Sequence, residues 1–144
     1  MIGRHLLIDF HDVSAGRLDD AELLSRLLGE AARRGGLTPL GLPVLHRFEG
    51  GGLTGYLLLS ESHIAVHTYP GLGFAALDIF ACGSGDPRAA LDVFRTGLAP
   101  RRERVTTATR GEGLDDRDSP DRSITSPPPA PASGPGRCPD LPLQ

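Results

Sequence analysis

Residues 60–69 (SESHIAVHTY) bring together side chains that nucleophilic and acid–base catalysis use. Ser62 offers a hydroxyl between Glu61 and His63, and a second imidazole, His67, follows four residues after the first. A hydroxyl beside an imidazole can be activated as a nucleophile, and paired histidines are common metal ligands. The segment therefore allows three interpretations: a metal site, a serine hydrolase, or a strand whose histidines make ordinary hydrogen bonds.

The metal interpretation depends on whether the segment is helical. On a helix, His63 and His67 would share one face at the spacing of zinc ligands. The alternation of apolar and polar residues over 64–68 instead favours a strand, in which the two rings lie about 13 Å apart. No glutamate follows His63 directly, so we expect no metal at this position.

A serine hydrolase would need its nucleophile in a Gly-x-Ser-x-Gly turn, which presents the hydroxyl at a sharp bend. Ser62 has no glycine on either side. Spacing alone therefore favours the third interpretation, a strand with ordinary histidines.

Composition narrows the chemistry further, because all 15 basic residues are arginine and the chain contains no lysine. Without a lysine amine there is no Schiff base to anchor pyridoxal phosphate, and a Walker-type phosphate loop is excluded for the same reason. The net charge of −3 gives no reason to expect a nucleic-acid surface.

The cysteines Cys82 and Cys138 lie in different surroundings and form no disulfide framework, which fits a reducing compartment. The N-terminal residues lead straight into a strand-like run without a signal peptide. No apolar stretch approaches the roughly 20 residues that span a bilayer. We expect a cytoplasmic protein that does not bind membranes.

Hydrophobic periodicity predicts an α+β fold. Apolar residues at helical spacing after an Asp predict helices at residues 19–34 and 87–98. Apolar and alternating runs predict strands at 5–11, 40–48, 53–60, 64–68, 74–82 and 104–109. Two helices on one face of a largely antiparallel sheet make a two-layer sandwich. The opposite face would also be apolar, so we expect a second copy of the chain to cover it.

Residues 5–13 and 74–83 resemble each other, since each is an apolar strand that precedes a predicted helix, with Asp and an aromatic at similar places. This similarity is consistent with an internal β-α-β duplication. We expect one folded domain over residues 1–110. Residues 111–144 are rich in Pro and Gly, and such a composition buries too little apolar area to offset chain entropy, so we expect a disordered tail.

A set of short motifs, in a fixed order along the chain, points to a function that none of the three interpretations of residues 60–69 includes. The motifs are GRHL at residues 3–6, HRF at 46–48, SESH at 60–63, HT at 67–68, ALDIF at 76–80 and CG at 82–83. With this order and spacing the chain resembles the prokaryotic S-adenosylmethionine decarboxylase proenzyme family, which is pyruvoyl-dependent. The resemblance covers about residues 3–110.

The resemblance implies that the chain cuts itself between Glu61 and Ser62. The Ser62 hydroxyl would attack the Glu61 carbonyl to form an ester, and β-elimination would leave dehydroalanine, which becomes a pyruvoyl group on loss of ammonia. This covalent group would replace pyridoxal phosphate as the electrophile that forms a Schiff base with a small-molecule substrate. No metal is implied.

The resemblance also implies roles for three other residues. Cys82 matches the cysteine that returns a proton to the substrate, a task that suits a thiol. His67 matches the histidine that assists self-cleavage by taking the α-carbon proton of Ser62. Thr54 stands where a serine helps to stabilise the cyclic intermediate. Because Ser62 and His67 are an odd number of residues apart, a straight strand would point them to opposite faces, so a turn or bulge must lie at the cleavage site.

The expected substrate site departs from the family pattern in one place. Phe48 and Tyr69 are candidates to stack on a flat base or to contact a cation, although both residue types also fit a core. The family usually has Trp-Pro-Glu where this chain has Tyr-Pro-Gly at 69–71. Gly71 lacks a carboxylate suited to hydrogen-bond ribose hydroxyls, and losing such a bond costs about 1.5–3 kcal/mol.

The implied function is conversion of S-adenosylmethionine to decarboxylated S-adenosylmethionine for polyamine (spermidine) biosynthesis, by a homodimer of cleaved protomers. Gly71 leaves a pyruvoyl-dependent decarboxylase of L-ornithine or L-arginine as an alternative. A non-catalytic regulatory partner of a related decarboxylase is a second alternative, but the joint presence of Ser62, His67 and Cys82 speaks against it.

Overall fold

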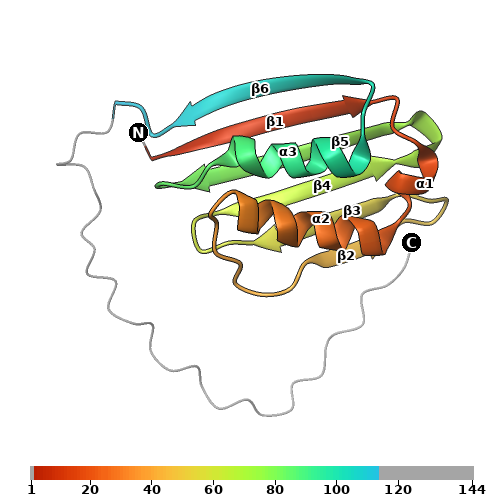
Figure 1. Cartoon of the computed structure of the whole chain (residues 1–144), viewed down its shortest axis with the longest axis horizontal. Coiled ribbons are helices and arrows are strands. Elements are labelled where there is room, and N and C mark those ends of the chain that lie inside the picture. Colours follow the sequence, from red (N-terminus) through yellow and green to blue (C-terminus); the bar gives the residue numbers. More distant parts are fainter. Residues whose placement is uncertain (1, 114–144) are drawn as a thin grey trace, which may run out of the picture. The chain divides into compact units, whose positions relative to one another are not determined.

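The computed structural model describes residues 2–113, which form one sheet with helices on one face (Figure 1). The strands are β1 (Gly3–His11), β2 (Val44–Arg47), β3 (Leu53–Leu58), β4 (His63–Tyr69), β5 (Phe74–Cys82) and β6 (Arg102–Arg110). The helices are α1 (Ala15–Leu18), α2 (Ala21–Arg34) and α3 (Pro87–Leu98), and the 3₁₀ turn η1 (Pro70–Leu72) joins β4 to β5. The strands lie in the order β2-β3-β4-β5-β1-β6, and every neighbouring pair is antiparallel.

Both long helices begin at an aspartate that caps their free N–H groups. The Asp20 side chain accepts a hydrogen bond from the Leu23 amide at the start of α2. Asp86 accepts from two amides at the start of α3, where Pro87 occupies the first turn and needs no N–H partner. The helices lie side by side across the sheet (Figure 1), and their apolar stripes are buried against it.

The alternation of side chains along each strand separates a core face from a second face. In β5, the side chains that face the helices are buried: Ala75, Leu77, Ile79 and Ala81. The intervening side chains are partly exposed and point the other way: Phe74, Ala76, Asp78, Phe80 and Cys82. We call this second side of the sheet the open face, because no helix among residues 2–113 covers it.

The order of the strands shows a repeated pattern. The segments β1-α2-β4 and β5-α3-β6 are each a strand, a helix and a strand, and β1 and β5 lie next to each other with Leu6 opposite Ile79. The hairpin of β2 and β3 is inserted between α2 and β4. Without that hairpin, the arrangement is the split β-α-β pattern of ferredoxin-like folds. This is what the expected internal duplication would produce.

The open face carries exposed apolar side chains. Leu7 is 42% exposed, Tyr56 40%, Leu58 50% and Val44 67%. A sheet face of this kind is typical of a surface that a partner covers, as the sequence led us to expect.

The expected α+β sandwich is confirmed, and β5 and α3 have the predicted bounds. The structure differs at α1 and η1, which are too short to give a periodic signal, and at β2, which begins only after Pro43. The expected tail falls largely on residues 114–144, outside the described residues. None of the helices among residues 2–113 has the length and hydropathy needed to cross a bilayer.

Candidate active site

The expected cleavage site lies in a tight turn between β3 and β4. The Leu59 amide donates a hydrogen bond of 2.9 Å to the carbonyl of Ser62, which closes the hairpin and leaves Ser60 and Glu61 at its tip. The peptide bond between Glu61 and Ser62 is therefore part of the turn and not of the hydrogen-bonded ladder. The turn that the sequence required at this position is present.

The segment before β2 holds the turn in place. The backbone N–H and the hydroxyl of Thr38 each donate a 2.9 Å hydrogen bond to the Glu61 carboxylate. The Ser60 amide donates to the carbonyl of Thr38 at 2.8 Å. The two bonds from Thr38, first that of the backbone and then that of the hydroxyl, lower the pKa of Glu61 below its ordinary value. The residue on the N-terminal side of the expected scissile bond is thus fixed by a charge-assisted contact.

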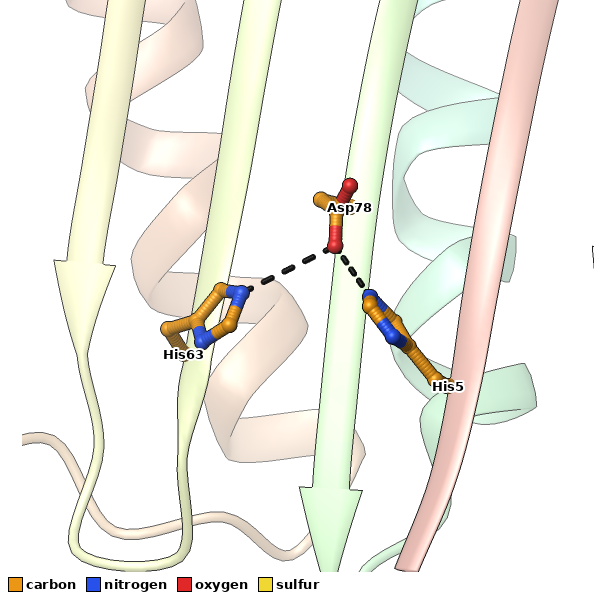
Figure 2. Close-up of side chains that lie close together, drawn as sticks. All are labelled: His5, His63 and Asp78. Atoms are coloured by element: carbon orange, nitrogen blue, oxygen red, sulfur yellow. Dashed lines mark hydrogen bonds and ion pairs between the residues drawn. The ribbon is translucent and has the colours of Figure 1, made fainter. Parts of the chain in front are cut away.

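The Ser62 hydroxyl faces a cluster of ring nitrogens and a carboxylate. Its oxygen lies 3.4 Å from Nδ1 of His63. On the other side of that ring, Nε2 lies 3.7 Å from Oδ1 of Asp78. The same carboxylate oxygen forms a short hydrogen bond with Nε2 of His5. Figure 2 shows Asp78 on β5 between His63 on β4 and His5 on β1.

Sequence reasoning did not predict this cluster. His5 and His63 both pair with Phe80 in the sheet, one from each side, and Asp78 follows on the same face two residues away. The alternation of β1, β4 and β5 was visible in the sequence. The register that brings His5 level with His63 joins segments 58 residues apart in the chain and carries no local signal.

The three ligand atoms of His5, His63 and Asp78 lie within 4.8 Å of one another, a distance at which such groups could hold a metal ion. The Asp78 oxygen is already bonded directly to His5, so a cation would have to displace the hydrogen from that bond. His5 and Asp78 therefore already bind each other, and His63 lies at ion-pair distance from the same carboxylate oxygen. His63 and His67 do not form a site together, because four residues of strand separate them by about 13 Å.

Cys82 lies next to the cleavage turn. Phe80 pairs with His63, the first residue of β4 after the turn, and Cys82 ends β5 two residues beyond Phe80. A Cβ atom on Gly3 would lie 3.1 Å from the Cys82 sulfur and 2.8 Å from the Phe80 ring. The glycine of the GRHL motif therefore leaves room beside the thiol, which is free and partly exposed.

The other expected site residues gather at the opposite end of the open face. The Thr54 hydroxyl lies 3.0 Å from Nδ1 of His67, its partner in the ladder of β3 and β4. Tyr69, two residues further along β4, packs against Phe74 with ring centroids 5.7 Å apart. Phe48 follows β2 at the same end and contacts the ring of His46 at 5.2 Å.

The expected site is therefore divided within one chain. The cleavage end contains Ser62 and Cys82 with the cluster around Asp78, and the far end contains His67, Thr54, Tyr69 and Phe48. Five residues of extended chain separate Ser62 from His67, a distance of roughly 16 Å. The turn at Ser62 does not shorten this path, because it folds the chain back toward β3 and not toward His67.

A groove of about 690 Å³ lies elsewhere, between α2 and α3. Its polar lining combines Arg26, Glu30, Arg34 and Asp92, which is a mixed-charge surface typical of solvated helix faces. It lies on the helix side of the sheet, so it does not belong to the expected site.

The contact between Thr38 and Glu61 predicts a measurable pKa. Thr38→Val removes the hydroxyl donor but keeps the backbone donor, so the pKa of the Glu61 carboxyl should rise part of the way toward 4.5. A carboxyl group whose pKa is lowered in the folded protein stabilises the fold at pH values above its ordinary pKa. Thr38→Val should therefore destabilise the protein at neutral pH and have less effect as the pH falls below about 4.

NMR titration of Glu61 in the uncut Ser62→Ala chain measures this pKa directly. Thr38→Ser is the matched control, since it keeps both donors and should leave the pKa unchanged. An unchanged Glu61 pKa in Thr38→Val would show that the hydroxyl does not bind the carboxylate in solution.

Comparisons of the sequence with a family model and with known proteins agree on one family. Residues 4–111 match the family described as S-adenosylmethionine decarboxylase. An S-adenosylmethionine decarboxylase proenzyme of Parasynechococcus marenigrum is 40% identical over 111 residues, which cover 76% of this chain and 86% of the relative. One of Brevibacillus brevis is 41% identical over 112 residues, covering 77% and 84%.

A solved structure agrees with these relatives. The crystal structure of the adenosylmethionine decarboxylase from Aquifex aeolicus VF5 superposes with a TM-score of 0.71 at 34% identity. The match covers 83% of this chain and 97% of that one. The part of this chain that the structure describes therefore corresponds to nearly the whole of that protein.

Proposed function

Because the chain belongs to the S-adenosylmethionine decarboxylase family, we propose that it is a self-processing, pyruvoyl-dependent carboxy-lyase that converts S-adenosylmethionine to decarboxylated S-adenosylmethionine. The observation that carries the proposal is the turn between β3 and β4. It presents the peptide bond between Glu61 and Ser62 outside the ladder, with the Ser62 hydroxyl beside an imidazole and with Cys82 at the end of β5, two residues beyond the partner of His63. Polyamine biosynthesis consumes this product.

The residues at the cleavage end fit a pyruvoyl group made from Ser62. The N→O shift needs a hydroxyl that can reach the preceding carbonyl, and a turn residue with partial exposure has that freedom. When formed, the group would supply a ketone that binds the substrate amine and accepts the electron pair left by carbon dioxide. Cys82 would then donate the proton that the former α-carbon needs, because its thiol is free and lies two residues beyond the partner of His63 in β5.

Ser62→Ala tests the cleavage site. The variant should remain one chain of full mass without decarboxylase activity, because neither the ester nor the ketone can form. Wild-type protein should give fragments of residues 1–61 and 62–144, the second with a ketone at its N-terminus, by intact-mass measurement. Ser60→Ala, a change in the same turn, is the control and should cut normally. Cutting of Ser62→Ala would refute the assignment.

Carbon dioxide release from S-adenosylmethionine, L-ornithine and L-arginine by the cut wild-type protein tests the reaction itself. Release from S-adenosylmethionine supports the proposal. Release of carbon dioxide from L-ornithine or L-arginine but not from S-adenosylmethionine would show that the protein is a decarboxylase of that basic amino acid. Complete cutting without release from any substrate would favour the regulatory partner.

The division of the site supports a homodimer as the working form. His67 and Thr54 lie roughly 16 Å from Ser62 in the same chain, yet the open face that carries the two and borders the turn has exposed apolar side chains. A twofold axis that lies between two packed open faces and runs across the strands would place the far end of one chain over the cleavage end of the other. Such an isologous contact would complete two sites at once.

Mixed dimers test whether His67 acts across the interface. His67→Ala alone should fail to complete cleavage, and Ser62→Ala alone has no serine to cut. Co-expression of the two chains should restore cutting of the His67→Ala chain, because its partner supplies His67. A partner that carries both substitutions is the control and should restore nothing. If the His67→Ala chain stays uncut with either partner, His67 acts only within its own chain.

The open space around Gly71 allows a carboxylate to be introduced there, which tests the choice of substrate. Gly71 lies in η1, directly after Tyr69-Pro70, and a Cβ atom built there meets nothing within 4 Å. A longer side chain therefore fits without displacing the backbone. The absence of a carboxylate at this position is the specific observation that keeps decarboxylation of L-ornithine or L-arginine as the second candidate function.

Gly71→Glu should lower the KM for S-adenosylmethionine by about 10- to 100-fold, the equivalent of one charge-assisted hydrogen bond. Cleavage should be unaffected, since neither Gly71 nor a carboxylate in its place takes part in the proposed cleavage steps. Gly41→Glu, at another glycine with open space around its Cβ, is the control. Steady-state kinetics that show no change in KM would mean that the new carboxylate does not reach the nucleoside.

A further inference from the structure

We propose that His63 is the base that removes the hydroxyl proton of Ser62 in the first step of self-cleavage, and that Asp78, His5 and Arg110 position it. The proposal rests on the proposed function, since it assigns a catalytic residue to the cleavage at Ser62. It concerns the ester-forming step, which comes before the step that the family resemblance gives to His67.

The hydrogen bonds of the cluster run in one direction. Arg110 can only donate, and its Nη1 lies 3.3 Å from Nδ1 of His5. Nδ1 of His5 must therefore accept, which leaves the hydrogen on Nε2. That Nε2–H donates to Oδ1 of Asp78. The guanidinium is itself held 5.5 Å above the ring of Phe80, so the chain of donors begins at a fixed charge.

Asp78 determines which nitrogen of His63 can act as the base. Its Oδ1 lies 3.7 Å from Nε2 of His63, and a carboxylate attracts a hydrogen on that atom. The lone pair of neutral His63 is then on Nδ1, the nitrogen that faces the Ser62 hydroxyl. The same carboxylate stabilises the positive charge that His63 acquires when it takes the proton.

Neighbouring rings restrict the orientation of His63. Tyr56 from β3 stacks on it with centroids 5.8 Å apart and an interplanar angle of 22°. Phe80 from β5 and His5 from β1 meet it edge to face at 6.1 and 6.2 Å. Three strands therefore hold the imidazole in one place. The 3.4 Å to the Ser62 oxygen is longer than a working hydrogen bond, and rotation of the small serine side chain is the movement that closes it.

The proposed step balances without a co-reactant. Nδ1 of His63 takes the hydroxyl proton while Oγ of Ser62 bonds to the carbonyl carbon of Glu61. The C–N bond between the two residues then breaks, and its nitrogen leaves as the amine of Ser62 after receiving the proton back from His63. The product is an ester between Glu61 and the Ser62 oxygen, and His63 ends neutral.

This assignment separates the two histidines in time. His63, beside the hydroxyl, serves ester formation, whereas His67 serves the later removal of the α-carbon proton. A chain that lacks His67 should therefore accumulate the ester, and one that lacks His63 should stop at the peptide. Hydroxylamine distinguishes these states, because it cleaves an ester at neutral pH and leaves a peptide bond intact.

The experiment compares freshly purified His63→Ala, His63→Gln and His67→Ala chains by intact mass, with and without hydroxylamine and with EDTA throughout. We expect His63→Ala to cut at least 100-fold more slowly than wild type and to stay whole in hydroxylamine, whereas His67→Ala is cut by it. Free imidazole should restore cutting of His63→Ala in proportion to its concentration. His63→Gln, which fills the ring space, should be as slow as His63→Ala.

Two results would overturn the assignment. One is cutting of His63→Gln or His63→Ala at the wild-type rate, and the other is accumulation of hydroxylamine-sensitive ester in either chain. These results leave the proposed function intact, because wild-type protein still cuts at Ser62. If wild-type protein stays uncut, the proposed function fails and this assignment fails with it.

A double-mutant cycle tests the positioning residues. Asp78→Asn should slow cutting at least 10-fold when His63 is present, yet add no slowing to the imidazole-rescued His63→Ala chain, because Asp78 acts only through that ring. Asp9→Asn, a carboxylate change elsewhere on the open face, is the matched control and should not slow cutting. Equal slowing by Asp78→Asn in both backgrounds would show a structural role and remove Asp78 from the proposal.

Discussion

The register of the central strands β4, β5 and β1 is the constraint on which the candidate site depends. Because side chains alternate along each strand, all the side chains of one parity line the core and those of the other reach the open face. A slip of one residue in β5 would bury Asp78 and Cys82 and expose Leu77 and Ile79. The apolar core that fixes this register therefore also fixes the chemistry on the other side of the sheet.

The turn between β3 and β4 is held on both sides although its own peptide bond lies outside the ladder. A peptide unit inside a ladder is held in place by its hydrogen bonds, whereas the bond between Glu61 and Ser62 lies just beyond the last pair. Thr38 still restrains its N-terminal side through the Glu61 carboxylate, and neighbouring rings restrain His63, the residue that follows Ser62. The turn is thus free to change its backbone chemistry without loosening the sheet.

Much of the fold could be predicted from local signals in the sequence, and the limits of the prediction are physical. An aspartate cap, a proline in the first turn and a buried apolar stripe define α3, so its bounds were predictable. The cluster of His5, His63 and Asp78 depends on pairing between distant segments, and no local pattern encodes it. The separation of Ser62 from His67 is different, because the extended chain predicted between them already implied roughly 16 Å. This distance, and not the parity of the two positions, keeps them apart.

The exposure of the cluster links assembly to chemistry. The side chains of Asp78 and His63 are 37% and 31% exposed in a single chain, so water weakens the attraction between the carboxylate and a charged imidazole. A second copy over the open face would remove that water and strengthen every charge interaction beneath it. The same contact would bring the far end of the partner to the cleavage turn. On the proposed function, such a chain would become reactive toward its own backbone only where it is paired, and the single chain would stay intact during folding.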